Sequence, residues 1–351
     1  MRTRRDFLRG AAGAAAGVLI LGSRGAAQPP RRQVTIGGRR VRVIDIHAHC
    51  VIPVQDITRG TPLERQGGGT GNQIIGPMRI EQLDRAGIDV QVLSINGYWW
   101  YAADRELAMR IVRAQNEGLA RIVATYPERF VALASVALQF PDLAAQQLED
   151  AVKRLNLRGA SIGGHVNGED LSLPKYDPFW AKAAELGLPV FMHPGGADNI
   201  VKENAFDGRG DLGNIIGNPL ETTYFLSRLI FDGTLDRFPG LRIIGAHGAG
   251  YLPSYLARTD VACRVRSNAN CANKRSPRDY FRRELLADSM VFTDEGLRHL
   301  VAEIGVSQVV FGTDMPFNWP STLDTILQAS YLSDADKEAI LGGTLAKLLR
   351  L

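Results

Sequence analysis

The segment Val41–His49 reads VRVIDIHAH, a run of apolar and β-branched residues that closes with two histidines. A short run of this kind predicts a buried β-strand. Similar runs predict further strands at Val90–Ile95, Phe130–Val136, Gly159–Gly163, Val190–His193, Leu241–Ala246, Met290–Thr293 and Val309–Gly312. Segments of helical length lie between the runs, among them Leu143–Leu155, Pro178–Leu186, Pro219–Asp232 and Glu295–Ile304.

This alternation of strands and helices decides the fold class. It is typical of βα units that build a parallel sheet. Eight units favour a closed (β/α)8 TIM barrel over an open, doubly wound sheet. No GxGxxG motif follows the first strand, which also disfavours a nucleotide-binding sheet. We therefore predict an α/β protein with one TIM-barrel domain at residues 41–351 and a linker at residues 28–40.

The first 27 residues have the features of an export signal. Arg4 and Arg5 precede an apolar, Gly/Ala-rich run at Gly10–Gly22, and small residues lead to Ala27. This pattern predicts a twin-arginine signal peptide at residues 1–27 and a periplasmic or secreted mature protein. A membrane anchor is disfavoured because the apolar run is shorter than the roughly 20 residues that a bilayer needs. We expect no membrane contact after the signal is removed.

The charge balance gives no indication of a nucleic-acid partner. The chain has 41 Lys and Arg against 37 Asp and Glu, but residues 1–27 contain five arginines and one acid. The mature protein would therefore carry 36 residues of each sign. With no clustered basic face, we expect a small molecule rather than nucleic acid as its partner.

The three cysteines do not suggest a cysteine metal site. Cys50, Cys263 and Cys271 form no CxxC pattern and have no zinc-finger spacing. In an oxidising compartment Cys263 and Cys271 could form a disulfide across a short loop, a point that the sequence leaves open.

Polar side chains lie where the predicted strands end. In a TIM barrel these ends converge on one face. His47 and His49 share one side of the first strand because of their i, i+2 spacing. Later strands are followed by His165, His193, His247 and Asp314. Of the six histidines, only His299 lies in a predicted helix. A single histidine of this kind is more often structural, but imidazoles and a carboxylate together suit Zn²⁺ or a similar ion.

Asp45, in the same strand as His47, has two readings. It could orient a metal ligand, or it could be a buried carboxylate that is simply hydrogen-bonded, and we favour the second.

Five segments resemble a known enzyme group. They are DIHAH at Asp45–His49, RFVALASVALQ at Arg129–Gln139, GGHVNGEDL at Gly163–Leu171, ETTYFLSRLIFDGTLDRFPGLRIIGAHGAGYLP at Glu221–Pro253 and FGTDMPF at Phe311–Phe317. They are similar to the amidohydrolase-related group that contains 2-amino-3-carboxymuconate-6-semialdehyde decarboxylase. The resemblance implies a metal-dependent TIM barrel and suggests a homodimer.

The resemblance also implies the roles of the site residues. His47, His49, His193 and Asp314 would hold one divalent metal ion, with Zn²⁺ expected and Mn²⁺ as the alternative. His247 would act on the substrate or on metal-bound water. The reaction expected is non-oxidative decarboxylation of an unsaturated or aromatic carboxylic acid. Hydrolysis of a lactone, ester or amide, with Asp314 as proton acceptor, is the alternative. A hydratase is a third reading, and a non-enzymatic metal-binding protein a fourth.

Two departures limit what the resemblance implies about the substrate. Gly195 and Gly196 follow Pro194, where the muconate-semialdehyde enzyme has a tryptophan directly after its His-Pro pair. The resorcylate-type decarboxylases begin with a Glu-x-His pair, which His47-x-His49 does not match.

The sequence contains several candidates for contacts with the substrate. The family uses arginines to hold substrate carboxylates, and we treat the candidates as surface residues; they are Arg59, Arg65, Arg79, Arg258 and Arg264. Aromatic candidates for a pocket wall, which could equally be loop packing, are Tyr98, Trp99, Trp100, Tyr101 and Trp319.

Overall fold

The computed structural model describes residues 31–68 and 71–351. The predicted signal peptide, residues 1–27, lies outside the described residues, as does the start of the predicted linker. Nearly all of the described residues belong to one compact unit, Arg32–Leu351. Within the described part of the chain, no helix is both long and apolar enough to cross a membrane.

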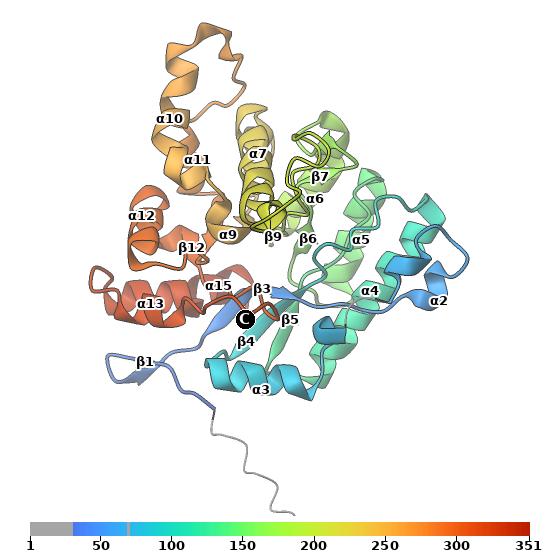
Figure 1. Ribbon diagram of the computed structural model, residues 1–351, viewed down its shortest axis with the longest axis horizontal. Helices are drawn as coiled ribbons and strands as arrows, with labels where there is room; N and C mark the ends of the chain where they lie inside the picture. Colours follow the sequence, from blue (N-terminus) through green and yellow to red (C-terminus); the bar gives the residue numbers. More distant parts are fainter. Residues whose placement is uncertain (1–30, 69–70) are drawn as a thin grey trace, which may run out of the picture. The chain divides into compact units, whose positions relative to one another are not determined.

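Parallel strands form the centre of this unit (Figure 1). One sheet contains β3 (Ile44–His49), β4 (Val90–Ser94) and β5 (Phe130–Ala132). The other sheet has the order β12 (Val309–Val310), β11 (Leu285–Asp288), β10 (Ile243–Gly245), β9 (Val190–Met192) and β6 (Ala160–Ile162).

The two sheets join at both edges. Ala134 pairs with Ala160 beyond the end of β5. On the other side, Ile46 N donates to Phe311 O and Asp314 N donates to His47 O. The ring of strands is therefore closed, and the predicted (β/α)8 TIM barrel is confirmed.

Helices surround the barrel and bury their apolar sides against it. The main ones are α3 (Pro77–Ala86), α4 (Arg105–Thr125), α5 (Pro141–Lys153), α6 (Asp177–Leu186), α7 (Asn218–Phe231), α10 (Leu252–Val265), α12 (Asp294–Ile304), α13 (Leu323–Gln328) and α15 (Thr344–Leu348). The four helices predicted by residue range correspond to α5, α6, α7 and α12. Ile46, Val92, Phe191 and Ile244 belong to one fully buried cluster contributed by strands around the ring.

The seventh strand lies earlier in the chain than predicted. We expected Met290–Thr293, whereas β11 is Leu285–Asp288. Leu285 pairs with Ile243 and Ala287 pairs with Val309, which places this shorter apolar run inside the sheet. Phe292 is instead 40% exposed, and Thr293 caps α12 by accepting a hydrogen bond from Gly296 N. The end of the seventh strand is therefore Asp288.

Part of the predicted linker, residues 28–40, is folded. Residues Thr35–Ile36 (β1) and Arg39–Arg40 (β2) form an antiparallel hairpin. Val34 and Ile36 are buried against the main core. The folded domain therefore begins before residue 41.

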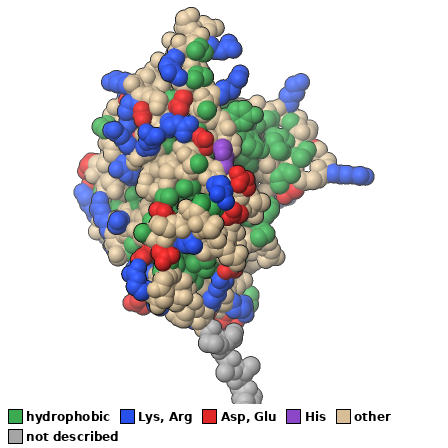
Figure 2. All heavy atoms as spheres, turned by 90° about the vertical axis from the view of Figure 1, so that its left-hand side faces the viewer, with side chains coloured by type: hydrophobic (Ala, Val, Ile, Leu, Met, Phe, Trp, Pro, Cys, Tyr) green, Lys and Arg blue, Asp and Glu red, His purple; other side chains and the backbone are tan. Residues whose placement is uncertain are grey.

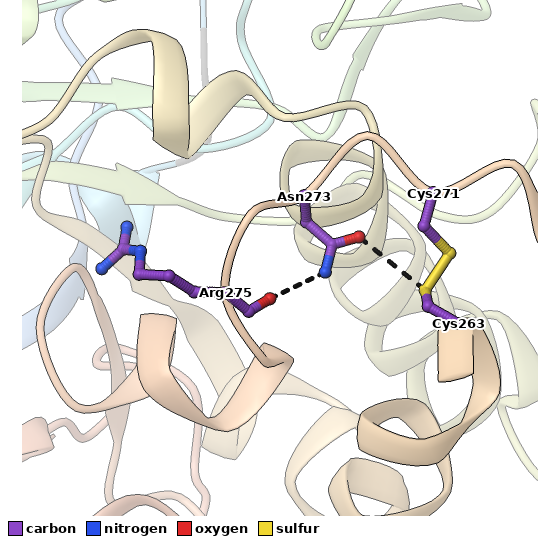
Figure 3. The surroundings of a disulfide bond; sticks show 4 residues. All are labelled: Cys263, Cys271, Asn273 and Arg275. Carbon is purple, nitrogen blue, oxygen red and sulfur yellow. Dashed lines mark hydrogen bonds between the residues drawn. A yellow bond between two sulfur atoms is a disulfide. The ribbon is translucent and has the colours of Figure 1, made fainter. Parts of the chain in front are cut away.

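Cys263 and Cys271 form a disulfide at the end of α10, with their Cα atoms 6.0 Å apart. Figure 3 shows Asn273 beside this bond, where its side chain also donates to Arg275 O. Cys50 is free and buried. The pairing that the sequence left open is thus present in the structure.

We predict that the disulfide stabilises the fold measurably. Closing a loop of this length should lower the entropy of the unfolded chain and contribute about 2–3 kcal/mol. Urea unfolding of the Cys263→Ser, Cys271→Ser double variant should show this loss. A reductant should reproduce it in the wild type and have no further effect on the variant. Equal stability with and without reductant would contradict the prediction.

The surface carries charges of both signs. Figure 2 shows one face of the molecule, on which basic and acidic side chains are intermixed.

Candidate metal centre

Strand β3 brings two histidines to the same side of the barrel. His47 and His49 are buried, and their rings lie 5.7 Å apart. The Nε2 atom of His47 is 3.1 Å from Oδ1 of Asp314, and the Nε2 atom of His49 is 2.8 Å from the same oxygen. The i, i+2 spacing therefore directs both imidazoles toward the residue that follows β12.

His193, directly after β9, completes this part of the group. Its Nε2 atom lies 3.1 Å from Nε2 of His49. Burial lowers the pKa of His49 and holds the pKa of His193 well below its usual value. Both rings therefore favour the neutral form, which has the nitrogen lone pair that a metal ligand needs.

His47 and Asp314 are electrostatically coupled. Burial opposes the charged form of His47, but the Asp314 and Asp288 carboxylates outweigh it and raise the pKa of His47 to about 10. Burial likewise opposes ionisation of Asp314, yet the neighbouring histidines, His47 above all, hold the pKa of Asp314 far below its usual value. Asp314 is thus a carboxylate that a cation would share with the imidazoles.

His247 follows β10 and lies at the same point. Its ring is 5.0 Å from that of His47, and its Nε2 atom is 3.7 Å from Oδ2 of Asp314. Ligand atoms of four residues lie within 4.8 Å of one another, namely those of His47, His193, His247 and Asp314. This group contains His247 where the predicted ligand set contains His49, although His49 has its own close contacts with Asp314 and His193.

The atoms in this group fit a divalent cation. Nε2 of His47 and Oδ1 of Asp314 are buried, yet neither has a partner in hydrogen-bond geometry among residues 31–68 and 71–351. Buried polar atoms without hydrogen bonds are costly in a folded protein. Imidazole nitrogens and a carboxylate oxygen are donors that Zn²⁺ and related ions accept. The side chains therefore form a site suited to such an ion.

Asp45 is the buried, hydrogen-bonded carboxylate that we favoured. Its Oδ2 atom accepts from Thr313 Oγ1 at 2.6 Å and from Gln91 Nε2 at 2.8 Å, and its Oδ1 atom accepts from two backbone amides. Burial raises its pKa to about 6 despite these bonds. Asp45 thereby ties β3 to the segment that carries Asp314.

Arg79 is not the surface residue that we expected. It is 3% exposed and donates to Gln91 Oε1 at 2.9 Å and to the backbone oxygen of His49 at 3.1 Å. These bonds hold the backbone at the end of β3, next to His49. Arg59, Arg65, Arg258 and Arg264 are exposed, as expected.

A cavity of about 550 Å³ opens beside the metal centre. Its walls include four of the site residues; the lining is His49, His193, Asp211, Asn214, Asn218, His247, Asp314, Phe317, Asn318 and Trp319. Phe317 meets the ring of His49 edge-on at 4.8 Å. The cavity can therefore accommodate a small molecule between the histidines and an aromatic wall.

Some predicted candidates lie elsewhere. Trp319 lines the cavity, but Trp100 is buried in a cluster with Val54 and Leu63. Tyr98 packs against Trp100, and neither lines the cavity. His165 is in the short strand β7 (His165–Val166), where its Nδ1 atom accepts from Gly168 N.

Glu221 is a buried carboxylate that sequence reasoning missed. It is 2% exposed on α7 and accepts backbone hydrogen bonds from Gly164 at 2.9 Å and Gly195 at 2.8 Å. These glycines belong to the loops that follow β6 and β9. Its position in the ETTYFL motif was the available signal, but the glycine partners are distant in sequence.

We predict a pH-dependent contribution of Glu221 to stability. Burial raises its pKa from 4.5 to about 7, despite the backbone hydrogen bonds. A raised folded-state pKa gives stability that is present below pH 4.5 and is lost as the pH rises to about 7. Relative to Glu221→Gln, the wild type should lose about 3 kcal/mol over this range. Urea unfolding of both proteins at several pH values tests this, and a constant difference would contradict it.

Comparison with known proteins agrees with the fold and identifies the family. The family model described as amidohydrolase matches residues 44–351. The chain is 32% identical over 285 residues to 2-amino-3-carboxymuconate-6-semialdehyde decarboxylase of Dictyostelium discoideum, covering 78% of this chain and 76% of that protein. The resemblance found in the sequence is therefore confirmed.

Two solved structures are similar over nearly the whole barrel. The 5-carboxyvanillate decarboxylase of Sphingomonas paucimobilis has a TM-score of 0.80 and 26% identity, covering 89% of this chain and 99% of that one. A dihydroxybenzoic acid decarboxylase of Polaromonas sp. JS666, solved with manganese and the inhibitor 2-nitroresorcinol, has a TM-score of 0.76 and 27% identity. It covers 89% of this chain and 97% of that one. On the strength of the barrel, its histidine–aspartate centre and these matches, the chain belongs to the amidohydrolase family.

Proposed function

We propose that this protein is a metal-dependent carboxy-lyase that removes CO₂ without oxidation from an unsaturated or aromatic carboxylic acid. The observation that carries the proposal is the group of histidines and one aspartate on the wall of a cavity with aromatic residues. Relatives named as decarboxylases of such acids support it.

In this proposal, His47, His49, His193 and Asp314 hold one divalent ion. The ion would supply positive charge that orients the substrate carboxylate and stabilises negative charge as the reaction proceeds. We propose Zn²⁺ for this site, since its preferred ligands match the donor set. The manganese in the Polaromonas structure makes Mn²⁺ the alternative. Elemental analysis of the purified protein distinguishes the two.

His247 would move the proton in the reaction. Cleavage of the carbon–carbon bond releases CO₂ and leaves the bonding electron pair on the substrate carbon. That carbon then takes a proton from the imidazolium form of His247, which becomes a neutral imidazole and regains a proton from water. The ring lines the cavity and is partly exposed, with 18% of its side chain accessible, so a substrate can reach it.

Product analysis tests the reaction type. Metal-loaded protein would be mixed with aromatic and muconate-type acids and, separately, with lactones, while CO₂ and acid release are both followed. We expect CO₂ from an acid. Acid formation from a lactone, with no CO₂ from any acid, would replace the proposal with hydrolysis, in which Asp314 accepts a proton from the attacking water.

We also propose that the protein is exported by the twin-arginine route. The Cys263–Cys271 disulfide supports this, because such bonds persist in oxidising compartments. A fusion of residues 1–40 should export a folded reporter, and replacing Arg4 and Arg5 by lysine should stop export. Continued export of the double variant would reject the assignment.

A further inference from the structure

Asp288 is a buried carboxylate at the centre of the site that no prediction included. It closes β11 and is fully buried. Its Oδ2 atom lies 2.6 Å from Nδ1 of His47 and accepts from the backbone of His247 at 3.0 Å. Its Oδ1 atom accepts from the backbone of Gly248 at 2.8 Å and of Met290 at 3.1 Å. Both oxygens are therefore occupied, by groups from three strand ends.

The contact with His47 decides which ring nitrogen carries a hydrogen. An ionised carboxylate only accepts hydrogen bonds, so Nδ1 of His47 must donate. The neutral ring then has its lone pair on Nε2, the atom that faces Asp314 at 3.1 Å. Asp288 thus selects the form of His47 that can bind a cation through Nε2.

The contacts with His247 and Gly248 act on the backbone. His247 has φ 56° and ψ 52°, and Gly248 has φ 66° and ψ 23°. A non-glycine residue in this left-handed region costs roughly 1 kcal/mol or more, so surrounding interactions must hold it there. Consecutive amides of these two residues both donate to Asp288. The carboxylate therefore stabilises the turn that points His247 toward Asp314.

We propose that Asp288 is a positioning residue that organises both parts of the site at once. It sets the donor nitrogen of His47 and holds the left-handed turn of His247, so that the metal ligand and the proton-transfer residue keep a common geometry. The roles of His47 as a metal ligand and of His247 as a proton-transfer residue rest on the proposed function. The contacts of Asp288 with both residues do not depend on it.

The test uses an isosteric substitution. Asp288→Asn keeps the volume of the side chain but leaves one acceptor oxygen in place of two. The new NH₂ group must then face either the donors of His47 and His247 or the donors of Gly248 and Met290, and it cannot accept their hydrogen bonds. We expect Zn²⁺, titrated against a competing chelator, to bind 10-fold to 100-fold more weakly than in the wild type. Asp288→Ala should weaken Zn²⁺ binding to a similar degree, because the charge and both acceptor oxygens are lost.

Asp45→Asn is the matched control. Asp45 is equally buried and accepts from the His47 backbone, but its side-chain partners are Gln91 and Thr313 and not an imidazole nitrogen. The Asp45→Asn variant should lower the thermal midpoint of unfolding about as much as Asp288→Asn does, while changing the Zn²⁺ affinity much less. In the zinc-loaded wild type, the His47 Nδ1 proton should give a strongly downfield NMR signal, and Asp288→Asn should shift or remove it.

Three results would overturn the inference. They are wild-type Zn²⁺ affinity in Asp288→Asn, an equal loss of affinity in Asp45→Asn, and an unchanged His47 Nδ1 proton signal in Asp288→Asn. None of these measurements uses a substrate. If the metal and NMR effects are as expected but no CO₂ is released, the positioning role of Asp288 stands and only the proposed lyase function is contradicted.

Discussion

Replacing His247 by alanine is expected to lower turnover by roughly 10²-fold to 10⁴-fold, the usual scale for losing a general acid or base. The imidazole lines the cavity in which we propose that the substrate binds, and its Nε2 atom lies 3.7 Å from Oδ2 of Asp314. Most of the bound metal should remain, because the proposed ligands are four other side chains, those of His47, His49, His193 and Asp314. Steady-state kinetics and elemental analysis on the same preparation test both parts.

The comparison with His49→Ala makes this prediction specific. His49 belongs to the predicted ligand set, whereas His247 belongs to the group of four residues whose ligand atoms lie within 4.8 Å of one another. If the prediction holds, His49→Ala loses metal and His247→Ala does not. Metal loss in proportion to activity in His247→Ala would make His247 a ligand. Unchanged turnover would make it a structural histidine, and the proton-transfer step would move to Asp314.

Replacing both His47 and His49 by alanine is expected to abolish metal binding. This change removes two imidazoles whose Nε2 atoms lie 3.1 Å and 2.8 Å from the Asp314 carboxylate, leaving too few donors for a tetrahedral ion. The wild type should contain about one divalent ion per chain by elemental analysis, and the double variant almost none.

His299→Ala provides the control for this experiment. His299 is an exposed histidine in α12, outside the group around Asp314, so its loss should leave the metal content unchanged. Full metal content in the His47→Ala, His49→Ala variant would show that the site lies elsewhere. Circular dichroism on all three proteins separates metal loss from unfolding.

Local sequence patterns determined much of the fold. The apolar, β-branched run that ends at His49 forms β3 because its side chains are buried on both sides of a parallel sheet. The ranges predicted for α5, α6, α7 and α12 agree with the structure to within a few residues. Interactions between close neighbours in the chain specify such elements, so a pattern can reveal them.

The same patterns placed the site residues at strand ends. The i, i+2 spacing of His47 and His49 alone directs them to one side of β3. Positions after β9, β10 and β12 brought His193, His247 and Asp314 to the same face, because parallel strands of a closed barrel end together.

Tertiary structure alone decided which polar groups support them. Asp288 is 241 residues from His47, and its strand was misplaced because Met290–Thr293 is as apolar as the true strand. The burial of Arg79 depends on Gln91 and His49, and the disulfide depends on how the chain turns after α10. A sequence shows which side chains can form hydrogen bonds, but the partner of a buried polar group comes from another strand. Only the closed barrel brings such strands within hydrogen-bond distance.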